Sequence, residues 1–323
     1  MRGGRLLAFV CLVGVLAHHA PAADAPDGIK VVGNLQYVPN GDPAQVLDLY
    51  LPKNAGDKPL PLIIWIHGGA WKAGDRFNGS AVPMATHGYA VAAIEYRFSQ
   101  KAVFPAQIQD CQAAVRWLRA NAATYGIDPD HIGVWGSSAG GHLAALLGTA
   151  GGSNAFPPIG GNEKVSDRVQ AVCDFYGPAD FTTVIDQAAK EPVKNVFHFN
   201  AAGDPYSALI GAPLGDNDKS RLVSPVHFVD KSDPPFIIFH GTKDALVPFA
   251  QSVELDAALR QAGVDSTLQR IPDAGHGGGE FRLPVVRKLI LCFFDKHLKG
   301  TQVKIEALPE SAFEWKPATT RGE

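Results

Sequence analysis

The sequence predicts an α/β fold, in which helices cover both faces of a mostly parallel central β-sheet. Short continuous apolar runs alternate along the chain with segments whose apolar residues recur at helical spacing. Continuous apolar runs are typical of strands buried on both faces, and their alternation with helices is typical of βαβ units. The 323 residues, of which 46% are hydrophobic and 19% charged, are ordinary for a globular chain with a sizeable core.

Each predicted element follows from its own pattern. Residues 45–51 alternate between apolar and polar and stop at Pro52, which predicts an antiparallel or edge strand. Short runs between turn residues predict further strands at 61–67, 89–96, 131–135, 169–175, 235–240 and 266–271. Apolar residues at helical spacing predict helices at 106–125, 138–149, 250–262 and 284–298.

The chain divides into two parts after its N-terminal segment is set aside. Residues 24–300 are predicted to form a single α/β domain, because strands and helices alternate through them. Within this domain, residues 177–233 have scattered Gly, Pro and Asp and weak periodicity, so we expect an insertion over the carboxyl ends of the strands. Residues 301–323 are predicted to be a polar C-terminal tail.

Residues 1–23 have the pattern of a secretory signal peptide. Two arginines precede an apolar run of twelve residues, and small residues offer a cleavage site near Ala22 and Ala23. The alternative, a membrane anchor, needs about 20 apolar residues. We therefore expect a secreted or periplasmic protein with no membrane span after cleavage, because no other apolar run approaches that length.

The charge and the motif content exclude several classes of protein. The net charge is −3 and no basic stripe is present, so no nucleic-acid partner is expected. The four cysteines lack CxxC or CxxH spacing and no HExxH motif occurs, so neither a metal site nor a cofactor is predicted. The sequence carries no signal of oligomeric state.

Residues 136–140, Gly-Ser-Ser-Ala-Gly, match G-x-S-x-G between a predicted strand and a predicted helix. A sharp bend between strand and helix would hold Ser138 in a strained conformation and direct the helix N-terminus at a developing negative charge. The pattern alone is weak, and its placement between strand and helix is what predicts a nucleophile. The alternative is a small-residue helix start with Ser138 as its cap.

A serine nucleophile needs a base, and the base needs a carboxylate that orients it. Asp244 follows the strand 235–240 and His276 follows the strand 266–271. Both therefore lie at strand carboxyl ends, in the chain order serine, acid, histidine that this architecture requires. Asp273 is the one close rival for the acid, but it precedes His276 by only three residues and is poorly placed behind the ring.

Three other histidines have structural interpretations. His67 and His240 end buried strands, and we expect each to bond backbone where the strand meets its loop. His142 follows Ser138 in the same predicted helix, and we expect it to pack in the core.

Residues 67–71, His-Gly-Gly-Ala-Trp, follow the strand 61–67. Glycines there let backbone N–H groups turn toward a developing oxyanion, where they would complement the N–H of Ala139. The alternative is a plain tight turn.

Four motifs together resemble the α/β-hydrolase superfamily, namely HGGAW, GSSAGG followed by HLAALLG, HGTKDALVP and AGHGG. They are similar to those of esterases labelled feruloyl-esterase-like or carbohydrate-esterase-like, near the hormone-sensitive-lipase and kynurenine-formamidase relatives. The resemblance spans about residues 30–300 and implies an α/β-hydrolase fold.

The resemblance also implies roles for individual residues. It implies Ser138 as nucleophile, with Asp244 and His276 as its partners. It implies oxyanion donors at Gly69, Ala70 and Ala139. HGGAW lacks the third glycine of the lipase-like HGGG members and has the tryptophan of the esterase and formamidase groups, which leaves the pair of loop donors open.

The predicted function is a secreted serine esterase that forms an acyl-enzyme with a small ester or an acylated carbohydrate, such as acetyl or feruloyl groups on plant polysaccharide. An arylformamidase-type amide hydrolase shares the HGGxW motif, although a signal peptide fits its intracellular substrate poorly. A peptidase of the prolyl-oligopeptidase kind has a similar catalytic module, but about 60 residues precede the HGG strand, too few for a propeller. A non-catalytic binding module is the remaining alternative, although all three catalytic positions are filled.

Substrate selection is predicted to reside in residues 177–233, because the triad and oxyanion groups contact only the ester itself. Aromatic side chains of this segment can stack on an aromatic acid or a sugar ring, and we expect at least one of them to line the pocket. The candidates are Phe181, Phe197, Phe199 and Tyr206, followed by Trp71 in its loop.

Overall fold

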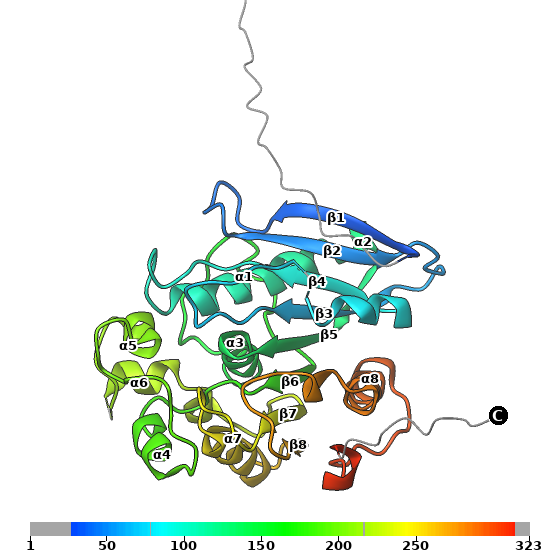
Figure 1. The fold of residues 1–323 in the computed structure, drawn as a ribbon. Helices are drawn as coiled ribbons and strands as arrows, with labels where there is room; N and C mark the ends of the chain where they lie inside the picture. Colours follow the sequence, from blue (N-terminus) through cyan, green and yellow to red (C-terminus); the bar gives the residue numbers. More distant parts are fainter. Residues whose placement is uncertain (1–26, 78, 216, 314–323) are drawn as a thin grey trace, which may run out of the picture.

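Eight strands form one sheet in the order β1-β2-β4-β3-β5-β6-β7-β8 in the computed structural model, which describes residues 27–77, 79–215 and 217–313 (Figure 1). The predicted signal peptide lies outside the described residues, as does the predicted tail from residue 314 onward. The strands are β1 (Ile29–Gln36), β2 (Val46–Pro52), β3 (Leu60–Ile66), β4 (Ala90–Ile94), β5 (Ile127–Ser137), β6 (Ala171–Phe175), β7 (Phe236–Gly241) and β8 (Ser266–Ile271).

The sheet is parallel except at one edge. β2 is antiparallel to both β1 and β4, and every other neighbouring pair is parallel. The prediction of an antiparallel strand at 45–51 agrees with β2. The sequence did not predict β1, because the alternation of this strand breaks where the register shifts between Val32 and Leu35 and Asn34 takes a φ of 57°.

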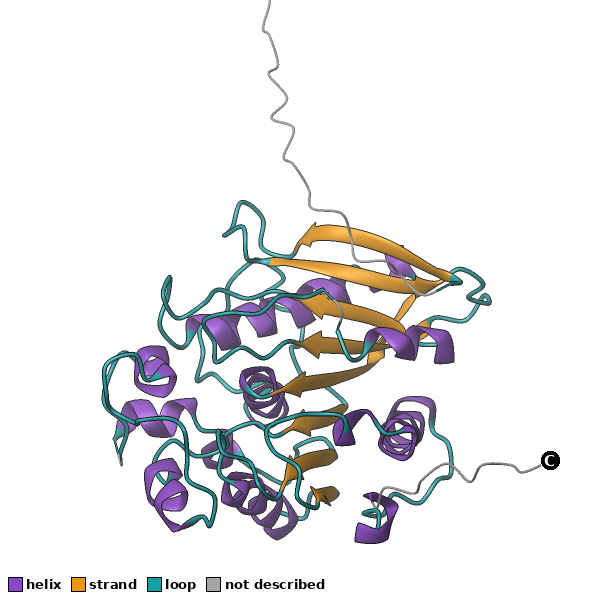
Figure 2. Ribbon diagram, viewed as in Figure 1, coloured by secondary structure: helices purple, strands orange, loops and turns teal. Residues whose placement is uncertain are grey.

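Helices lie on both faces of the sheet (Figure 2). The α-helices are α1 (Ala106–Ala120), α2 (Ala122–Tyr125), α3 (Ala139–Thr149), α4 (Val184–Lys190), α5 (Pro205–Ile210), α6 (Asp218–Val223), α7 (Phe249–Gln261) and α8 (Pro284–Lys299). The 3₁₀-helices are η1 (Val82–His87), η2 (Pro225–Phe228), η3 (Glu280–Arg282) and η4 (Glu310–Phe313). Apolar side chains of α1, α3 and α7 pack on one face, and those of η1 and α8 pack on the other.

The central strand β3 shows why continuous apolar runs form this sheet. Its side chains alternate between the two faces, with Leu62, Ile64 and Ile66 toward α1 and α3. Ile63 and Trp65 pack toward η1 and α8. A strand covered on both sides needs apolar residues at every position. The predicted α/β-hydrolase fold class is confirmed by this layered, mostly parallel sheet and by the structural neighbours reported below.

The predicted helix at 106–125 is two helices, α1 and α2. The break comes at Asn121, whose side chain donates to the Trp117 carbonyl at 2.8 Å and so competes with the helical hydrogen-bond ladder. Gly126, in the left-handed conformation with a φ of 66°, ends α2.

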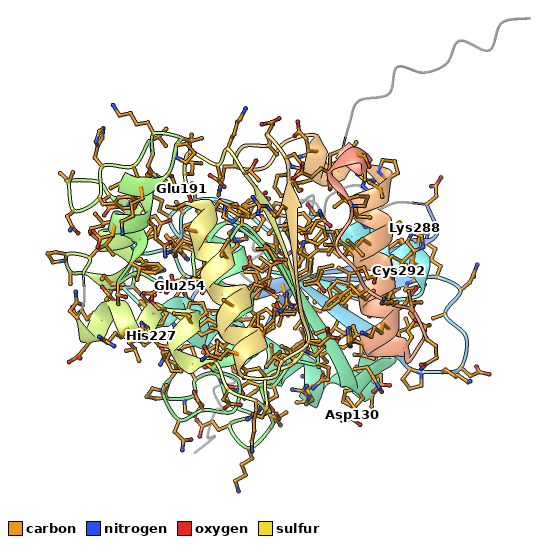
Figure 3. The ribbon with its side chains drawn as sticks, turned by 90° about the horizontal axis from the view of Figure 1, so that it is seen from below. Asp130, Glu191, His227, Glu254, Lys288 and Cys292 are labelled. Atoms are coloured by element: carbon orange, nitrogen blue, oxygen red, sulfur yellow. The ribbon has the colours of Figure 1, made fainter. Side chains whose placement is uncertain are left out.

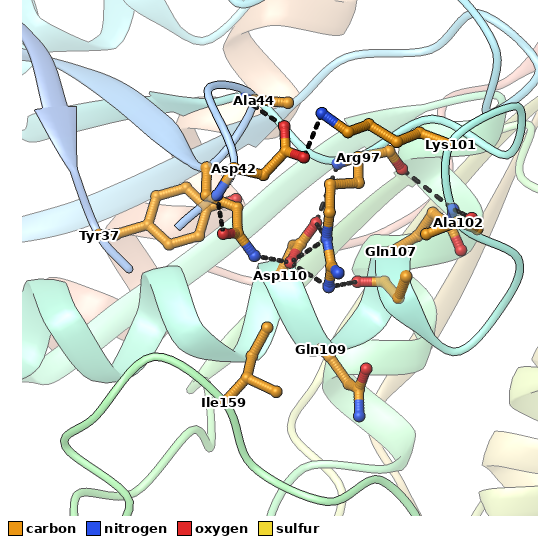
Figure 4. A network of polar contacts seen from close by, with 12 residues as sticks. Tyr37, Asp42, Ala44, Arg97, Lys101, Ala102, Gln107, Gln109, Asp110 and Ile159 are labelled. Carbon is orange, nitrogen blue, oxygen red and sulfur yellow. Dashed lines mark hydrogen bonds and ion pairs between the residues drawn. The ribbon is translucent and has the colours of Figure 1, made fainter. Parts of the chain in front are cut away.

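A polar network fixes the start of α1 against the connection from β4 (Figure 4). The buried carboxylate of Asp110 accepts from Gln45 at 2.7 Å and from the Arg97 guanidinium at 2.8–3.1 Å. Gln107 donates to the carbonyls of Arg97 and Ala102. A charge buried in this way is tolerated because all of its acceptor sites face donors.

Residues 177–233 carry α4, α5, α6 and η2, which sequence analysis did not predict. Each of these helices has seven residues or fewer, so no helical periodicity develops. α5 and α6 lie on the side toward which the arrowheads of the parallel strands point (Figure 1). Glu191 and Glu254 lie where α4 meets α7 (Figure 3), and Glu254 accepts from Gln187 of α4 at 2.6 Å.

Within the described part of the chain, no helix has the length and apolar character needed to cross a membrane.

Candidate active site

Ser138 occupies a strained turn between β5 and α3. Its φ of 54° and ψ of −120° are unusual for a residue with a side chain, and its N–H donates to the Phe175 carbonyl at 2.8 Å. The flanking glycines are required by space: a Cβ on Gly136 would lie 2.1 Å from the Gly140 oxygen, and a Cβ on Gly140 would lie 2.1 Å from the Ile66 oxygen. The pattern predicted from residues 136–140 is therefore a sharp turn that presents the hydroxyl of Ser138.

The structure brings together the three residues predicted as nucleophile, base and acid. His276 Nε2 lies 2.8 Å from Ser138 Oγ, and His276 Nδ1 lies 2.7 Å from Asp244 Oδ2. They follow β5, β7 and β8, whose carboxyl ends meet at one edge of the sheet. The rival Asp273 has a side chain that is 77% exposed and pairs with Lys243 at 2.8 Å.

Asp244 accepts hydrogen bonds on both oxygens. The backbone N–H groups of Leu246 and Val247 donate to Oδ1 at 2.7 and 3.0 Å, and His240 Nε2 lies 3.1 Å from Oδ2. Burial acts to raise the pKa of Asp244, but the hydrogen bonds from His240 and His276 outweigh it and hold the pKa well below its usual range. Asp244 is therefore an anion at neutral pH.

His240 does more than the predicted backbone bond. Its Nε2 does lie 3.1 Å from the Val247 carbonyl, but it also contacts Asp244, and Nδ1 lies 2.7 Å from Ser252 Oγ. Both neighbours of Nε2 are acceptors, so Nε2 carries the proton, and Ser252 then donates to Nδ1. The contact between His240 and Asp244 was not predicted, although the spacing His-x-x-x-Asp after a strand places both side chains near one turn.

The loop at 67–71 has three successive residues with positive φ, namely Gly69 (113°), Ala70 (53°) and Trp71 (56°). Gly69 is required here, since a Cβ would lie 2.0 Å from the Ala73 oxygen. No backbone hydrogen bond among the described residues uses the N–H of Gly69, Ala70 or Ala139. Gly69 and Ala70 line the cavity at Ser138, so the loop offers unused backbone donors beside the Ser138 hydroxyl.

His67 connects this loop to the residues that follow β4. The sequence predicted a backbone bond, and Nδ1 does lie 2.7 Å from the Gly68 carbonyl. In addition, Nε2 lies 3.0 Å from Glu95, and the ring stacks on Tyr96 at 4.6 Å. These contacts with the residues just after β4 were not predictable from the pattern around His67 itself.

A cavity of about 330 Å³ opens over Ser138 and His276. Of the aromatic residues proposed for substrate binding, Trp71, Phe197 and Tyr206 line it. Phe181 does not line the cavity; it is fully buried and packs on Tyr206, with ring centroids 5.0 Å apart. Phe199 also stays outside and packs on Tyr206 at 5.3 Å. The other apolar lining residues include Pro178, Pro205, Leu246 and Val247.

Tyr176 lines the same cavity and was missed by sequence analysis. Its ring packs on His276 with centroids 4.5 Å apart. Burial raises the pKa of Tyr176 to about 12, so its hydroxyl stays neutral, and it hydrogen bonds with Ser137. The signal was available, because Tyr176 directly follows a predicted strand, as Ser138, Asp244 and His276 do.

Comparison with known proteins adds a family to this geometry. The BD-FAE family model matches residues 47–259. The chain belongs to the BD-FAE family. The match includes the loop at 67–71, Ser138 and Asp244, and it ends before His276, which the structure nevertheless joins to the other two.

Two mycobacterial proteins and two solved structures show what this BD-FAE member is similar to. Esterase LipQ of Mycobacterium tuberculosis is 32% identical over 249 residues, which cover 75% of this chain and 56% of LipQ. Esterase LipC of the same organism is 32% identical over 245 residues, which cover 73% and 57%. The chain thus spans about half the length of the curated relatives it matches.

A truncated carbohydrate esterase from gut microbiota is 34% identical, with a TM-score of 0.76, and the match covers 86% of this chain and 99% of that one. A bifunctional GH43-CE protein of Bacteroides eggerthii is 33% identical, with a TM-score of 0.75, over 83% of this chain and 35% of that one. The predicted resemblance to carbohydrate-esterase-like α/β-hydrolases is confirmed by these matches.

In this BD-FAE member, Trp71 is held by His142 of α3. Trp71 Nε1 donates to His142 Nδ1 at 3.2 Å, and His142 Nε2 donates to the Val223 carbonyl at 2.7 Å. His142 is fully buried, as predicted for a packing residue, and burial lowers its pKa to about 4. The neutral ring therefore connects the loop at 67–71 to the end of α6.

No group of three or more His, Cys, Asp or Glu side chains in the described ranges is arranged to hold a metal ion.

Proposed function

We propose that this chain is a serine carboxylic-ester hydrolase that removes acetyl or feruloyl groups from acylated plant polysaccharide. The observation that carries the proposal is the hydrogen-bonded line from Ser138 through His276 to Asp244, open to a cavity with aromatic walls. The names of its relatives and structural neighbours, which are esterases and carbohydrate esterases, support the reaction and the substrate class.

The first half of the reaction acylates Ser138. His276 Nε2 takes the hydroxyl proton while Ser138 Oγ attacks the ester carbon, and the carbonyl oxygen becomes an oxyanion. Donors at Gly69 or Ala70 and at Ala139 stabilise that charge, with each donor contributing about 3 kcal/mol in comparable sites. His276 then gives the proton to the departing sugar oxygen, and the ester carbon–oxygen bond breaks.

The second half releases the acid. Water attacks the acyl carbon while His276 takes its proton. His276 then returns this proton to Ser138 Oγ as the bond between the acyl carbon and Oγ breaks, which frees Ser138 and the carboxylic acid. Asp244 remains an anion throughout and stabilises the imidazolium that forms in each half. We also propose that residues 1–23 direct export, which would bring the enzyme to polymeric substrate outside the cytoplasm.

The test compares four substrates with purified wild type and Ser138→Ala: p-nitrophenyl acetate, methyl ferulate, acetylated xylan and N-formylkynurenine. We expect turnover of the esters by wild type and loss of at least about 10⁴-fold in Ser138→Ala, because only the nucleophile is removed. Circular dichroism checks that the variant is folded. A folded wild type that hydrolyses none of the esters would support a binding module, and a preference for N-formylkynurenine would support the amide hydrolase.

A further inference from the structure

A second cavity, of about 740 Å³, lies between η1 and α8 on the face of the sheet opposite α1 and α3. It shares two lining residues, Ser137 and Tyr176, with the cavity over Ser138. The two cavities therefore meet at the wall formed by these residues. The proposed mechanism uses only the first of them.

The side chains that line this second cavity carry positive charge. Arg282 of η3 and Arg287 and Lys288 of α8 line it, and the lining contains no aspartate or glutamate. All three side chains are exposed, and no ion pair or side-chain hydrogen bond joins any of them to another residue in the described ranges. Lys288 lies along α8 one turn before Cys292 (Figure 3). One carboxylate, Glu280, stands nearby beside Gly278, which leaves a surplus of positive charge.

The walls between these cations are aromatic and apolar. They include Trp135, Phe175, Phe281 and Met84, each 4–6% exposed. The indole N–H of Trp135 is buried and has no acceptor among the described residues. A buried donor without a partner is uncommon and indicates a place where a ligand or water supplies the missing acceptor.

We propose that this second cavity binds a negatively charged sugar, a uronic acid, of the polysaccharide whose acyl group is cleaved at Ser138. The inference rests on the proposed function. The cavity over Ser138 is at the small end of the range for ligand sites, so a polymer held there must continue beyond it. Ser137 and Tyr176 line both cavities, so a polymer that extends from Ser138 past these two residues reaches the second cavity. There the apolar wall contacts the sugar ring, and the guanidinium groups bind its carboxylate in a forked arrangement.

The experiment compares acetylated xylo-oligosaccharides of equal length with and without a glucuronic acid branch. We expect wild type to have a higher kcat/KM on the acidic oligosaccharide, and 0.5 M NaCl to reduce the difference, because salt screens exposed charges. In Arg287→Gln/Lys288→Gln, the ratio of acidic to neutral kcat/KM should fall about tenfold through a rise in KM, as expected for loss of two exposed charge contacts.

A matched control removes two lysines from the connection between β2 and β3, at the end of the sheet where the parallel strands begin. Lys53→Gln/Lys58→Gln changes the net charge by the same amount and should leave the ratio within twofold. A binding measurement separates recognition from chemistry: calorimetry with Ser138→Ala should detect the acidic oligosaccharide, and Arg287→Gln/Lys288→Gln added to Ser138→Ala should weaken it about tenfold.

Two results would overturn the subsite while the proposed function stands. One is equal kcat/KM on acidic and neutral oligosaccharides in wild type. The other is an equal loss in the control pair and in the α8 pair. If wild type hydrolyses neither oligosaccharide nor p-nitrophenyl acetate, the proposed function itself is wrong, and the subsite is withdrawn with it.

Discussion

The two sides of the cavity over Ser138 are built in different ways. On one side, the turns after β5, β7 and β8 hold Ser138, Asp244 and His276 in a chain of hydrogen bonds of 2.7–2.8 Å. On the other side, residues 177–233 contribute Pro178, Phe197, Pro205 and Tyr206, which meet the cavity through packing. Directional bonds on rigid strands position reacting atoms, whereas packed loops shape a wall that can vary without disturbing them.

The largest effect should come from the acid on the strand side. In Asp244→Asn, kcat should fall by about 10⁴, as in the serine-protease triad, a different protein, because an amide favours the wrong histidine tautomer. Asp273→Asn is the matched control and should stay within twofold of wild type, because the Asp273 side chain is exposed and its carboxylate pairs with the exposed Lys243. Comparable losses in both variants, measured with p-nitrophenyl acetate, would reassign the acid.

His142 connects Trp71 to Val223 at the end of α6, and its protonation should change the free energy of unfolding. Its pKa of about 4 lies below the value of about 6.5 in an unfolded chain, so the unfolded state binds the proton first as the pH falls. Stability is therefore complete above pH 6.5 and is lost as the pH falls toward 4, by about 2 kcal/mol between pH 7 and pH 5.

His142→Gln keeps one acceptor for Trp71 and one donor for Val223 but does not titrate. We therefore expect the free energy of unfolding, measured by urea titration, to fall between pH 7 and pH 5 by about 2 kcal/mol less in His142→Gln than in wild type. Equal pH dependence in the two proteins would show that His142 does not couple the loop to α6 in its neutral form.

His240 tests how far the strand side depends on hydrogen bonds behind the acid. His240→Leu removes one donor to an ionised carboxylate, a bond of about 1.5–3 kcal/mol, so kcat should fall roughly ten- to hundredfold. KM should stay within about twofold, because His240 contacts Asp244 and not the cavity. His240→Gln retains an N–H donor and should recover most of the loss; failure of Gln to do so would indicate a packing role only.

The smallest effect should come from the packed side. Phe197 lines the cavity and Phe199, two residues later, does not. Phe197→Ala should therefore change the ratio of kcat/KM for methyl ferulate and p-nitrophenyl acetate by about threefold to tenfold, as expected when part of an aromatic contact is lost. Phe199→Ala should change this ratio less than twofold. If both variants leave it unchanged, the loop of Trp71 becomes the next candidate for selectivity.

The same contrast explains what the sequence could and could not predict. Ser138, Asp244 and His276 each come directly after a strand, and the carboxyl ends of parallel strands meet, so a local pattern was enough to place them together. The network behind them was not local: His67 pairs with Glu95 across 28 residues, and Trp71 with His142 across 71. The residues that neighbour His67 and His142 in the sequence do not predict such distant partners.

For residues 177–233, the sequence predicted that aromatic side chains line the cavity, but it did not predict which of them do so. The helices there are too short for a periodic pattern, so the inward and outward faces of its aromatics could not be distinguished. Phe181 and Phe199 were grouped with Phe197 and Tyr206 on residue type alone. The structure separates them. Phe197 and Tyr206 line the cavity, whereas Phe181 and Phe199 pack against the ring of Tyr206 outside it.

The contact between Ser138 and His276 joins residues 138 positions apart in the chain. Closing so long a loop costs entropy that is recovered only when β6, β7 and β8 have paired in succession onto β5. Contacts of this separation are typical of slow steps in folding, whereas α1 and α3 depend largely on local bonds. After dilution from denaturant, the recovery of turnover should therefore lag behind the recovery of the helical circular dichroism signal. The length of this lag would measure how long the C-terminal half of the sheet takes to form.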